Sequence, residues 1–170
     1  MQYDLTDNIT SISTKGSAIF GIFADKDINI LAKSVSATDL EKIKGIIKKT
    51  SFEGKISQSL CIYDLSNSKL EKIYLVGLGE KDKYSEKKFL KVVVALSDLC
   101  KKENINNIYL GLDSLIGNKE INIDWAIRNI SIHINGADYV YSETKNKTKN
   151  KINYKINKII FICTSVKSQY

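Results

Sequence analysis

Few side chains in this 170-residue sequence are suited to catalysis or metal binding. His133 is the only histidine, so a Ser-His-Asp or Cys-His site would have to include it, yet no motif surrounds it. Cys61, Cys100 and Cys163 lie far apart, whereas zinc sites use closely spaced ligand pairs. We therefore predict no catalytic residue and no metal ligand. We interpret His133 as a partly exposed residue and the cysteines as buried thiols.

Two short motifs could bind ligands through the backbone or through carboxylates. Gly77-Leu78-Gly79 follows a predicted strand, where dinucleotide-binding turns occur because glycines let backbone amides approach a pyrophosphate. Asp82 replaces the third glycine of that motif, so we favour a tight turn at a strand end. Phosphate binding by Gly77 and Gly79, as in a nucleotide or ADP-ribose site, is the alternative. Asp25 and Asp27 read as turn residues, with a hard-metal site as their alternative.

Most of the net charge of +7 comes from one segment near the end of the sequence. Residues 141–170 hold seven lysines and one acidic residue, and the lysines are concentrated between Lys145 and Lys158. In an extended segment, four alternating lysines could follow a phosphate backbone: Lys145, Lys147, Lys149 and Lys151. Arginine is the better reader of bases, and Arg128 is the only one. We favour a solvated hairpin, with nucleic-acid binding as the alternative.

The elements that would position these residues alternate between β-branched runs and helical patterns, which predicts an α/β fold with a mixed, largely parallel sheet flanked by helices. The strand candidates are Ser17–Phe23, Ser59–Leu65, Lys72–Val76, Ile108–Leu112 and Lys158–Cys163, with Gln2–Ile9 as an outer strand. Neither repeats nor a linker divide the chain. We predict one domain over residues 1–170 with an ordered core of about 2–165.

Three segments carry helical periodicity. Thr38 and Glu41 have the spacing of a capping box, which predicts a helix over 38–49. Ser85 is the expected N-cap of a longer helix, since apolar residues recur after it at steps of three and four. Residues 122–136 fit a helix or a strand, and we favour the helix because the segment is long for a strand.

The composition also indicates a compartment. An odd number of widely spaced cysteines is typical of reduced thiols. No apolar run approaches the roughly 18 residues of a membrane span. Acidic residues stand in Met1–Thr10 where a signal peptide needs a positive charge. We predict a cytoplasmic protein with no membrane partner.

The order of these features resembles the amino-terminal domain of the leucyl (cytosol) aminopeptidases. In that domain a V-G-L-G-K turn precedes a helix that begins near a serine, as Val76–Gly79 and Ser85 do here. The stretch from Asn135 to Lys145 looks like its later "G…Y-x-F…Y-K" passage. The resemblance implies a macro-domain-like fold.

The same resemblance implies a function that depends on more than this chain. Full-length members carry two divalent metal ions, zinc or manganese, in a carboxyl-terminal catalytic domain and form hexamers. The catalytic signatures of that domain are absent here, so no catalytic or metal residue carries over. We expect an inactive accessory domain that supports assembly and active-site access. Some bacterial members bind DNA partly through this domain, so the resemblance keeps DNA as a possible partner and nucleic-acid binding as the alternative function.

Overall fold

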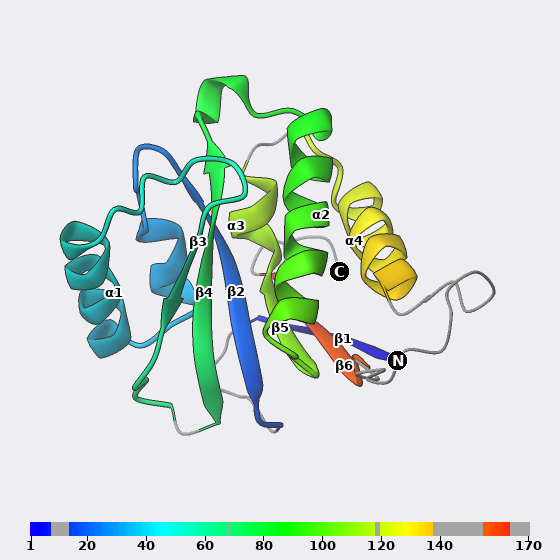
Figure 1. Cartoon of the computed structure of the whole chain (residues 1–170), viewed down its shortest axis with the longest axis horizontal. Helices are drawn as coiled ribbons and strands as arrows, with labels where there is room; N and C mark the ends of the chain where they lie inside the picture. The colour runs from blue at the N-terminus through cyan, green and yellow to red at the C-terminus, as the bar shows by residue number, and fades with distance from the viewer. Residues whose placement is uncertain (8–13, 68, 118–119, 138–154, 164–170) are drawn as a thin grey trace, which may run out of the picture.

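The computed structural model describes residues 1–7, 14–67, 69–117, 120–137 and 155–163, which form a sheet flanked by helices (Figure 1). The sheet consists of β1 Gln2–Thr6, β2 Gly16–Phe23, β3 Ser59–Ile62, β4 Leu70–Gly79, β5 Asn107–Gly111 and β6 Lys158–Ile162. Its strand order is β1-β6-β5-β2-β4-β3. All neighbours are parallel except β3 and β4. The predicted α/β class with a mixed, largely parallel sheet is confirmed.

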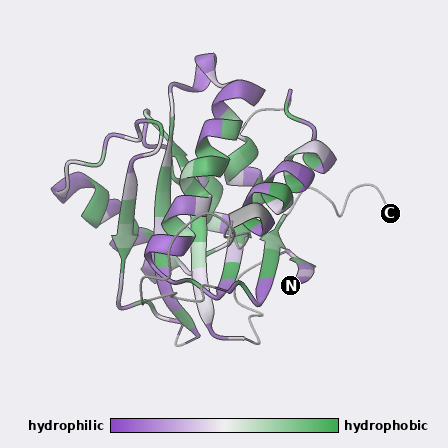
Figure 2. Cartoon of the chain, turned by 45° about the vertical axis from the view of Figure 1, so that its right-hand side comes forward, coloured by the Kyte–Doolittle hydropathy of each residue, from purple (hydrophilic) through white to green (hydrophobic). Residues whose placement is uncertain are grey.

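The sequence of the central strand β2 is almost continuously apolar because the strand is covered on both faces. Every residue of β2 is buried, because helices cover the sheet on both sides. Alternate residues point to opposite faces: Ile19 packs in one core, and Phe20 packs in the other. Figure 2 shows mostly hydrophobic strands between helices that alternate hydrophobic and hydrophilic stripes.

Helices α2 (Glu86–Lys102) and α4 (Ile123–Ala137) cover one face of the sheet. Ser85 occupies the predicted N-cap position of α2, although its side chain makes no capping hydrogen bond. The ambiguous segment 122–136 is helical, as we favoured. Ile130 and Ile134 are fully buried against the sheet, whereas Ile132 is 55% exposed, which is the pattern of a helix packed on one side.

The other face is covered by η1 (Asn29–Lys33) and α1 (Ala37–Lys49). The predicted capping box at Thr38 and Glu41 is wrong, since the N-cap of α1 is Ser36. The Ser36 hydroxyl accepts a hydrogen bond from the Asp39 amide at 3.1 Å. The Asp39 carboxylate is buried and accepts from the amide and hydroxyl of Ser66 at 2.8 and 2.6 Å. This tertiary anchor sets the helix start, so local spacing alone misplaced it.

Three short helices were not predicted. They are η1, η2 (Lys81–Lys83) and α3 (Leu112–Ile116), and α3 begins directly after β5. The predicted strand Ser59–Leu65 stops at Ile62, because Asp64 has a φ of 56°, which breaks an extended backbone. Within the described residues, no helix is long and apolar enough to cross a membrane.

Candidate functional site

Two hollows lie beside the carboxyl end of β2, and such strand ends are the usual place for ligands in parallel sheets. The larger hollow, of about 660 Å³, also borders the end of β4. It is lined by Ala24, Lys26, Glu53, Lys55, Ile56, Gly79, Glu80 and Lys88. The smaller hollow, of about 270 Å³, lies next to the last turns of α1. It is lined by Lys26, Ile28, Lys44, Ile47, Lys48 and Thr50. Lys26 lies between the two hollows and lines both.

The loop after β2 holds Lys26 in a defined turn. Asp25 accepts a hydrogen bond from the Asp27 amide at 3.0 Å, and Asp27 accepts one from the Asn29 amide at 2.9 Å. Lys26 has a φ of 57° between them, and its amide donates to the Phe23 carbonyl at 2.9 Å. The interpretation of Asp25 and Asp27 as turn residues is confirmed, because their carboxylates cap backbone amides.

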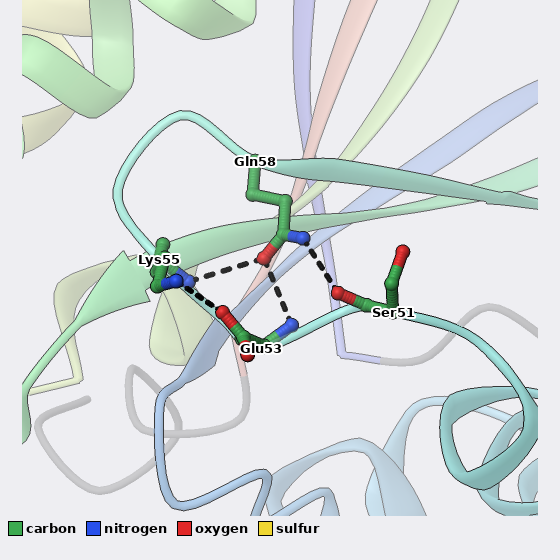
Figure 3. A network of polar contacts seen from close by, with 4 residues as sticks. All are labelled: Ser51, Glu53, Lys55 and Gln58. Carbon is green, nitrogen blue, oxygen red and sulfur yellow. Dashed lines mark hydrogen bonds and ion pairs between the residues drawn. The ribbon is translucent and has the colours of Figure 1, made fainter.

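A second loop, residues 51–58, is held together by the side chain of Gln58 (Figure 3). Its Oε1 atom accepts from the amides of Glu53 and Lys55 at 2.9 and 3.4 Å, and its Nε2 donates to the Ser51 carbonyl at 3.0 Å. One amide side chain thus satisfies three backbone groups of an irregular segment. This arrangement presents Glu53 and Lys55, which form an ion pair, to the larger hollow.

The same loop explains the glycines of the Gly77-Leu78-Gly79 motif. The predicted tight turn is wrong, since β4 continues through Gly79. Loop 51–58 lies directly on the strand, and a Cβ at Gly77 would come within 1.9 Å of the Lys55 carbonyl oxygen. The Gly79 amide donates to the Gly54 carbonyl at 2.8 Å. Gly77 lets the protein's own backbone approach, Gly79 has a φ of 81°, and phosphate binding by the two glycines stays the alternative.

The charges around the larger hollow are unequally partnered. Hydrogen bonds from Lys55 and Lys83 lower the pKa values of the Glu53 and Glu80 carboxyls. Each carboxylate therefore forms an ion pair with a lysine two or three residues further along the chain. Among the described residues, by contrast, no carboxylate lies within ion-pair distance of Lys26 or Lys88. Lys26 and Lys88 nevertheless contribute to the lowered pKa values of Glu53 and Glu80, and three lysines against two glutamates leave the lining with a small excess of positive charge.

The crevice where the strand order reverses, between β2 and β5, is occupied by α3. The Ser114 hydroxyl accepts from the Gly21 amide at 3.0 Å and donates to the Gly111 carbonyl at 2.7 Å. Leu112 and Leu115 are fully buried in the same helix. Ligands of doubly wound sheets commonly enter at this crevice. Here protein side chains occupy it, and the hollows lie on the β4 side of β2.

The predicted lysine segment falls outside the described residues, which include neither Lys145 and Lys147 nor Lys149 and Lys151. Lys158, at the end of that segment, is described. Its ammonium lies 2.5 Å from the Asp4 carboxylate, across the pair of strands β6 and β1. This lysine is therefore neutralised within the sheet and is a poor candidate for a phosphate contact.

His133 and the three cysteines lie away from both hollows. His133 is half-buried on α4, as predicted, with Nδ1 2.9 Å from the Asn129 carbonyl oxygen. Cys100 and Cys163 are buried, whereas Cys61 is only half-buried because β3 is an edge strand. All three are thiols rather than half-cystines. Across the described parts of the chain, no three His, Cys, Asp or Glu side chains gather in a way that could hold a metal ion.

Sequence reasoning missed the site that the structure assembles. Lys26, Lys55 and Lys88 come from three separate loops or helices and meet only because β2 and β4 end side by side. Lysine is also common throughout the chain, since 25 of the 26 basic residues are lysine. No local spacing could single these three out. The usable signals were the paired Asp25 and Asp27 around Lys26 and the Gly77-Leu78-Gly79 motif, of which Gly79 lines the larger hollow.

Comparison with protein families gives one match over most of the chain. The sequence model described as "Cytosol aminopeptidase family, N-terminal domain" matches residues 19–148. One relative, a probable cytosol aminopeptidase of Hamiltonella defensa, is 22% identical over 99% of this chain and 33% of its own length. Another, from Buchnera aphidicola, is 31% identical over 78% of this chain and 25% of its own length. The chain thus spans a quarter to a third of these relatives.

Solved structures show the same fold. A tomato leucine aminopeptidase aligns with a TM-score of 0.62 at 15% identity, over 97% of this chain and 33% of that protein. The macrodomain of DarG from Mycobacterium tuberculosis also aligns at 0.62, with 6% identity, over 95% of this chain and 98% of that domain. At such identities the likeness concerns the fold alone. The macro-domain-like fold predicted from the sequence is confirmed.

Proposed function

This chain belongs to the cytosol aminopeptidase family, as its N-terminal domain, and on that basis we propose that it is the non-catalytic domain of a leucyl aminopeptidase. The full-length enzyme would remove amino-terminal residues from peptides. The observation that carries this proposal is the coverage. The family's N-terminal domain accounts for residues 19–148, while the chain spans a third or less of its relatives. The chemistry is assigned to the part of the relatives that this chain lacks.

The described residues do not fit the two divalent ions, zinc or manganese, that the family resemblance implies. Such a site needs several carboxylate or imidazole ligands brought together, and no three gather in the described parts of this chain. We therefore place both ions, and every catalytic step that uses them, in the part of the enzyme beyond this chain.

The domain's own contribution is to support oligomer assembly and to shape access to the active site. Its expected partners are the catalytic domain of its own polypeptide and neighbouring subunits of a hexamer. A cytoplasmic location accords with three cysteines that are thiols rather than half-cystines. Removing this domain from the full-length protein should disrupt the hexamer in native mass spectrometry. An intact hexamer with unchanged cleavage of long peptides would overturn the assembly role.

The absence of catalysis is tested on the 170-residue chain itself. Incubation with leucine p-nitroanilide and either Mn²⁺ or Zn²⁺ should release no p-nitroaniline, and a leucine aminopeptidase run in parallel serves as the positive control. Metal-dependent turnover that co-elutes with the chain and disappears with a chelator would refute the proposal, because it would place the reaction among these residues.

Nucleic-acid binding is the second candidate function, and charge favours it. Residues 141–170 contribute most of the net charge of +7. A DNA duplex should be retarded by the chain at low ionic strength and released as salt rises, since phosphate contacts depend on counterion release. Replacing Lys145, Lys147, Lys149 and Lys151 with glutamine should abolish the shift. No retardation at low salt would eliminate this function.

A further inference from the structure

The smaller hollow combines an apolar lining with a positively charged rim. Ile28, in the loop after β2, and Ile47, in the last turns of α1, both line it, although each is a core residue that is only 5% exposed. Lys26 and Lys48 line the same hollow and are exposed. A ligand that matched both features would carry an apolar group and a negative charge close together.

The positive charge of this rim is only partly balanced by the described carboxylates, because Lys26 acts on Glu53 and Lys48 acts on Glu41 from beyond ion-pair distance. Lys44 is paired with Glu41 at 2.8 Å. No carboxylate of the described residues lies within ion-pair distance of Lys26 or Lys48. The acidic residues that flank Lys26 use carboxylate oxygens to accept hydrogen bonds from backbone amides of their own turn. Neither Lys26 nor Lys48 is held in a close ion pair within the described residues, so both ammonium groups can approach an anion from outside.

The hollow is small, which narrows the class of ligand. Sites for drug-sized molecules occupy roughly 300–1,000 Å³, and this one measures about 270 Å³. It accommodates a group the size of one amino acid. A phosphate backbone would use the lysines but would leave Ile28 and Ile47 without an apolar partner, so the lining favours a ligand with its own hydrocarbon group.

We propose that this hollow binds the carboxyl-terminal residue of a peptide. The apolar side chain of that residue would lie on Ile28 and Ile47, and its α-carboxylate would pair with Lys26 and Lys48. The inference rests on the proposed function, because it takes the ligand from the class of molecule that the full-length enzyme shortens. It adds a second point of contact for a peptide, on the N-terminal domain.

The backbone around the hollow is held in place before any ligand arrives. Lys26 sits in a turn fixed by Asp25 and Asp27, and Ile47 belongs to a helix whose carboxyl end follows directly. Binding would then order only the lysine side chains, which keeps the entropic cost low. The expected affinity is nevertheless weak, since exposed ion pairs contribute little and are screened by salt.

The test compares two probes on the ¹⁵N-labelled 170-residue chain at low salt. N-acetyl-leucine carries the carboxylate, and N-acetyl-leucinamide differs only in lacking its charge. We expect saturable shifts of the Ile28, Ile47 and Lys48 amides with N-acetyl-leucine. Binding of the amide should be about threefold to tenfold weaker, the factor expected for two exposed charge contacts. Acetate, which lacks the apolar group, should also bind more weakly.

Matched variants assign the binding to this hollow. The double variant K26Q/K48Q should weaken N-acetyl-leucine binding about threefold to tenfold, because both charge contacts are lost. K91Q/K101Q removes the same charge from exposed positions on α2 and should leave binding unchanged. Equal binding of acid and amide, equal binding of acetate, or equal effects of the two double variants would each overturn the proposal.

Failure of this test is distinguishable from failure of the proposed function. N-acetyl-leucine has no free amino terminus to be removed, so its binding reports on the hollow alone. If no binding is seen, the peptide contact is refuted while the domain's place in an aminopeptidase stands. If the chain itself hydrolyses leucine p-nitroanilide, the proposed function is refuted whatever the shifts show.

Discussion

Replacing Gly77 with alanine would drive a methyl group into the backbone of loop 51–58. The added Cβ would lie 1.9 Å from the Lys55 carbonyl oxygen and 2.6 Å from the Gly54 carbonyl carbon. Both obstacles are backbone atoms, so no side-chain rotation relieves the clash. The loop must move away from β4.

The cost follows from the hydrogen bonds that this movement breaks. Three backbone bonds join the loop to the strand: Gly77 amide to Gln58 carbonyl at 2.7 Å, Gly79 amide to Gly54 carbonyl at 2.8 Å, and Ser57 amide to Gly77 carbonyl at 3.3 Å. At about 0.5–1.5 kcal/mol for each bond, we expect G77A to lower the free energy of unfolding by about 2–4 kcal/mol.

Gly45 provides the matched control for this measurement. It lies within α1, and a Cβ there meets no atom within 4 Å. Alanine in a helix interior is favoured over glycine by about 0.5–1 kcal/mol, so G45A should raise the free energy of unfolding. Urea denaturation followed by circular dichroism compares both variants with the parent chain. A G77A chain as stable as the parent would refute the account of loop 51–58 packed on β4.

Two further predictions concern buried polar groups. Burial raises the pKa of Asp39, but hydrogen bonds from Ser66 and Ser36 outweigh it, so the pKa lies below its usual value. The stabilisation is present above the unfolded-state pKa of about 3.9 and is lost as pH falls through the lower folded-state pKa. In denaturation series, we expect D39N to have a lower free energy of unfolding than the parent chain at pH 7, and the difference between the two should shrink as pH falls to 2. A difference that stays constant from pH 7 to pH 2 would contradict this account of Asp39. S114A should cost about 1–3 kcal/mol, because the buried Gly21 amide loses its acceptor; an unchanged midpoint in urea would count against the role given to α3.

The fold combines a macro-domain-like topology with a crevice that is closed by its own chain. Strand order places the carboxyl ends of β2 and β5 at the point where ligands commonly enter such sheets. A short helix, α3, follows β5 without a loop and buries Leu112 and Leu115 there. Likeness to macrodomains therefore describes the architecture of this chain and does not by itself supply a nucleotide site.

Some elements were predictable because their signal is local. The apolar residues of α2 recur at helical spacing. Phe89, Val93 and Leu96 are all buried on the face that this spacing predicts. The central strand β2 is recognisable from a continuous apolar run. The N-cap of α1 was misplaced by two residues, at Thr38 instead of Ser36, because Asp39 contacts Ser66, a residue 27 positions away.

In the candidate site, too, some residues act through local contacts and others through contacts with distant segments. Asp25 and Asp27 could be interpreted as turn residues from sequence, because each side chain acts on a backbone amide two residues away. The glycines at 77 and 79 could not, because their role depends on a loop that precedes them by some twenty residues and returns to lie on the strand. The glycine spacing resembles a phosphate-binding turn, but in this structure Gly77 leaves room for the backbone of loop 51–58.

The sequence by itself determined the α/β class, the membership of the family and the location of excess charge, because these depend on composition, periodicity and short motifs. Only the tertiary structure decided where ligands could bind. Parallel strands bring their carboxyl ends to one edge of the sheet, and this places Lys26 beside both Lys48 and Lys88. Helix α3 fills the neighbouring crevice. Proximity between residues far apart in the chain is set by packing, which no local pattern encodes.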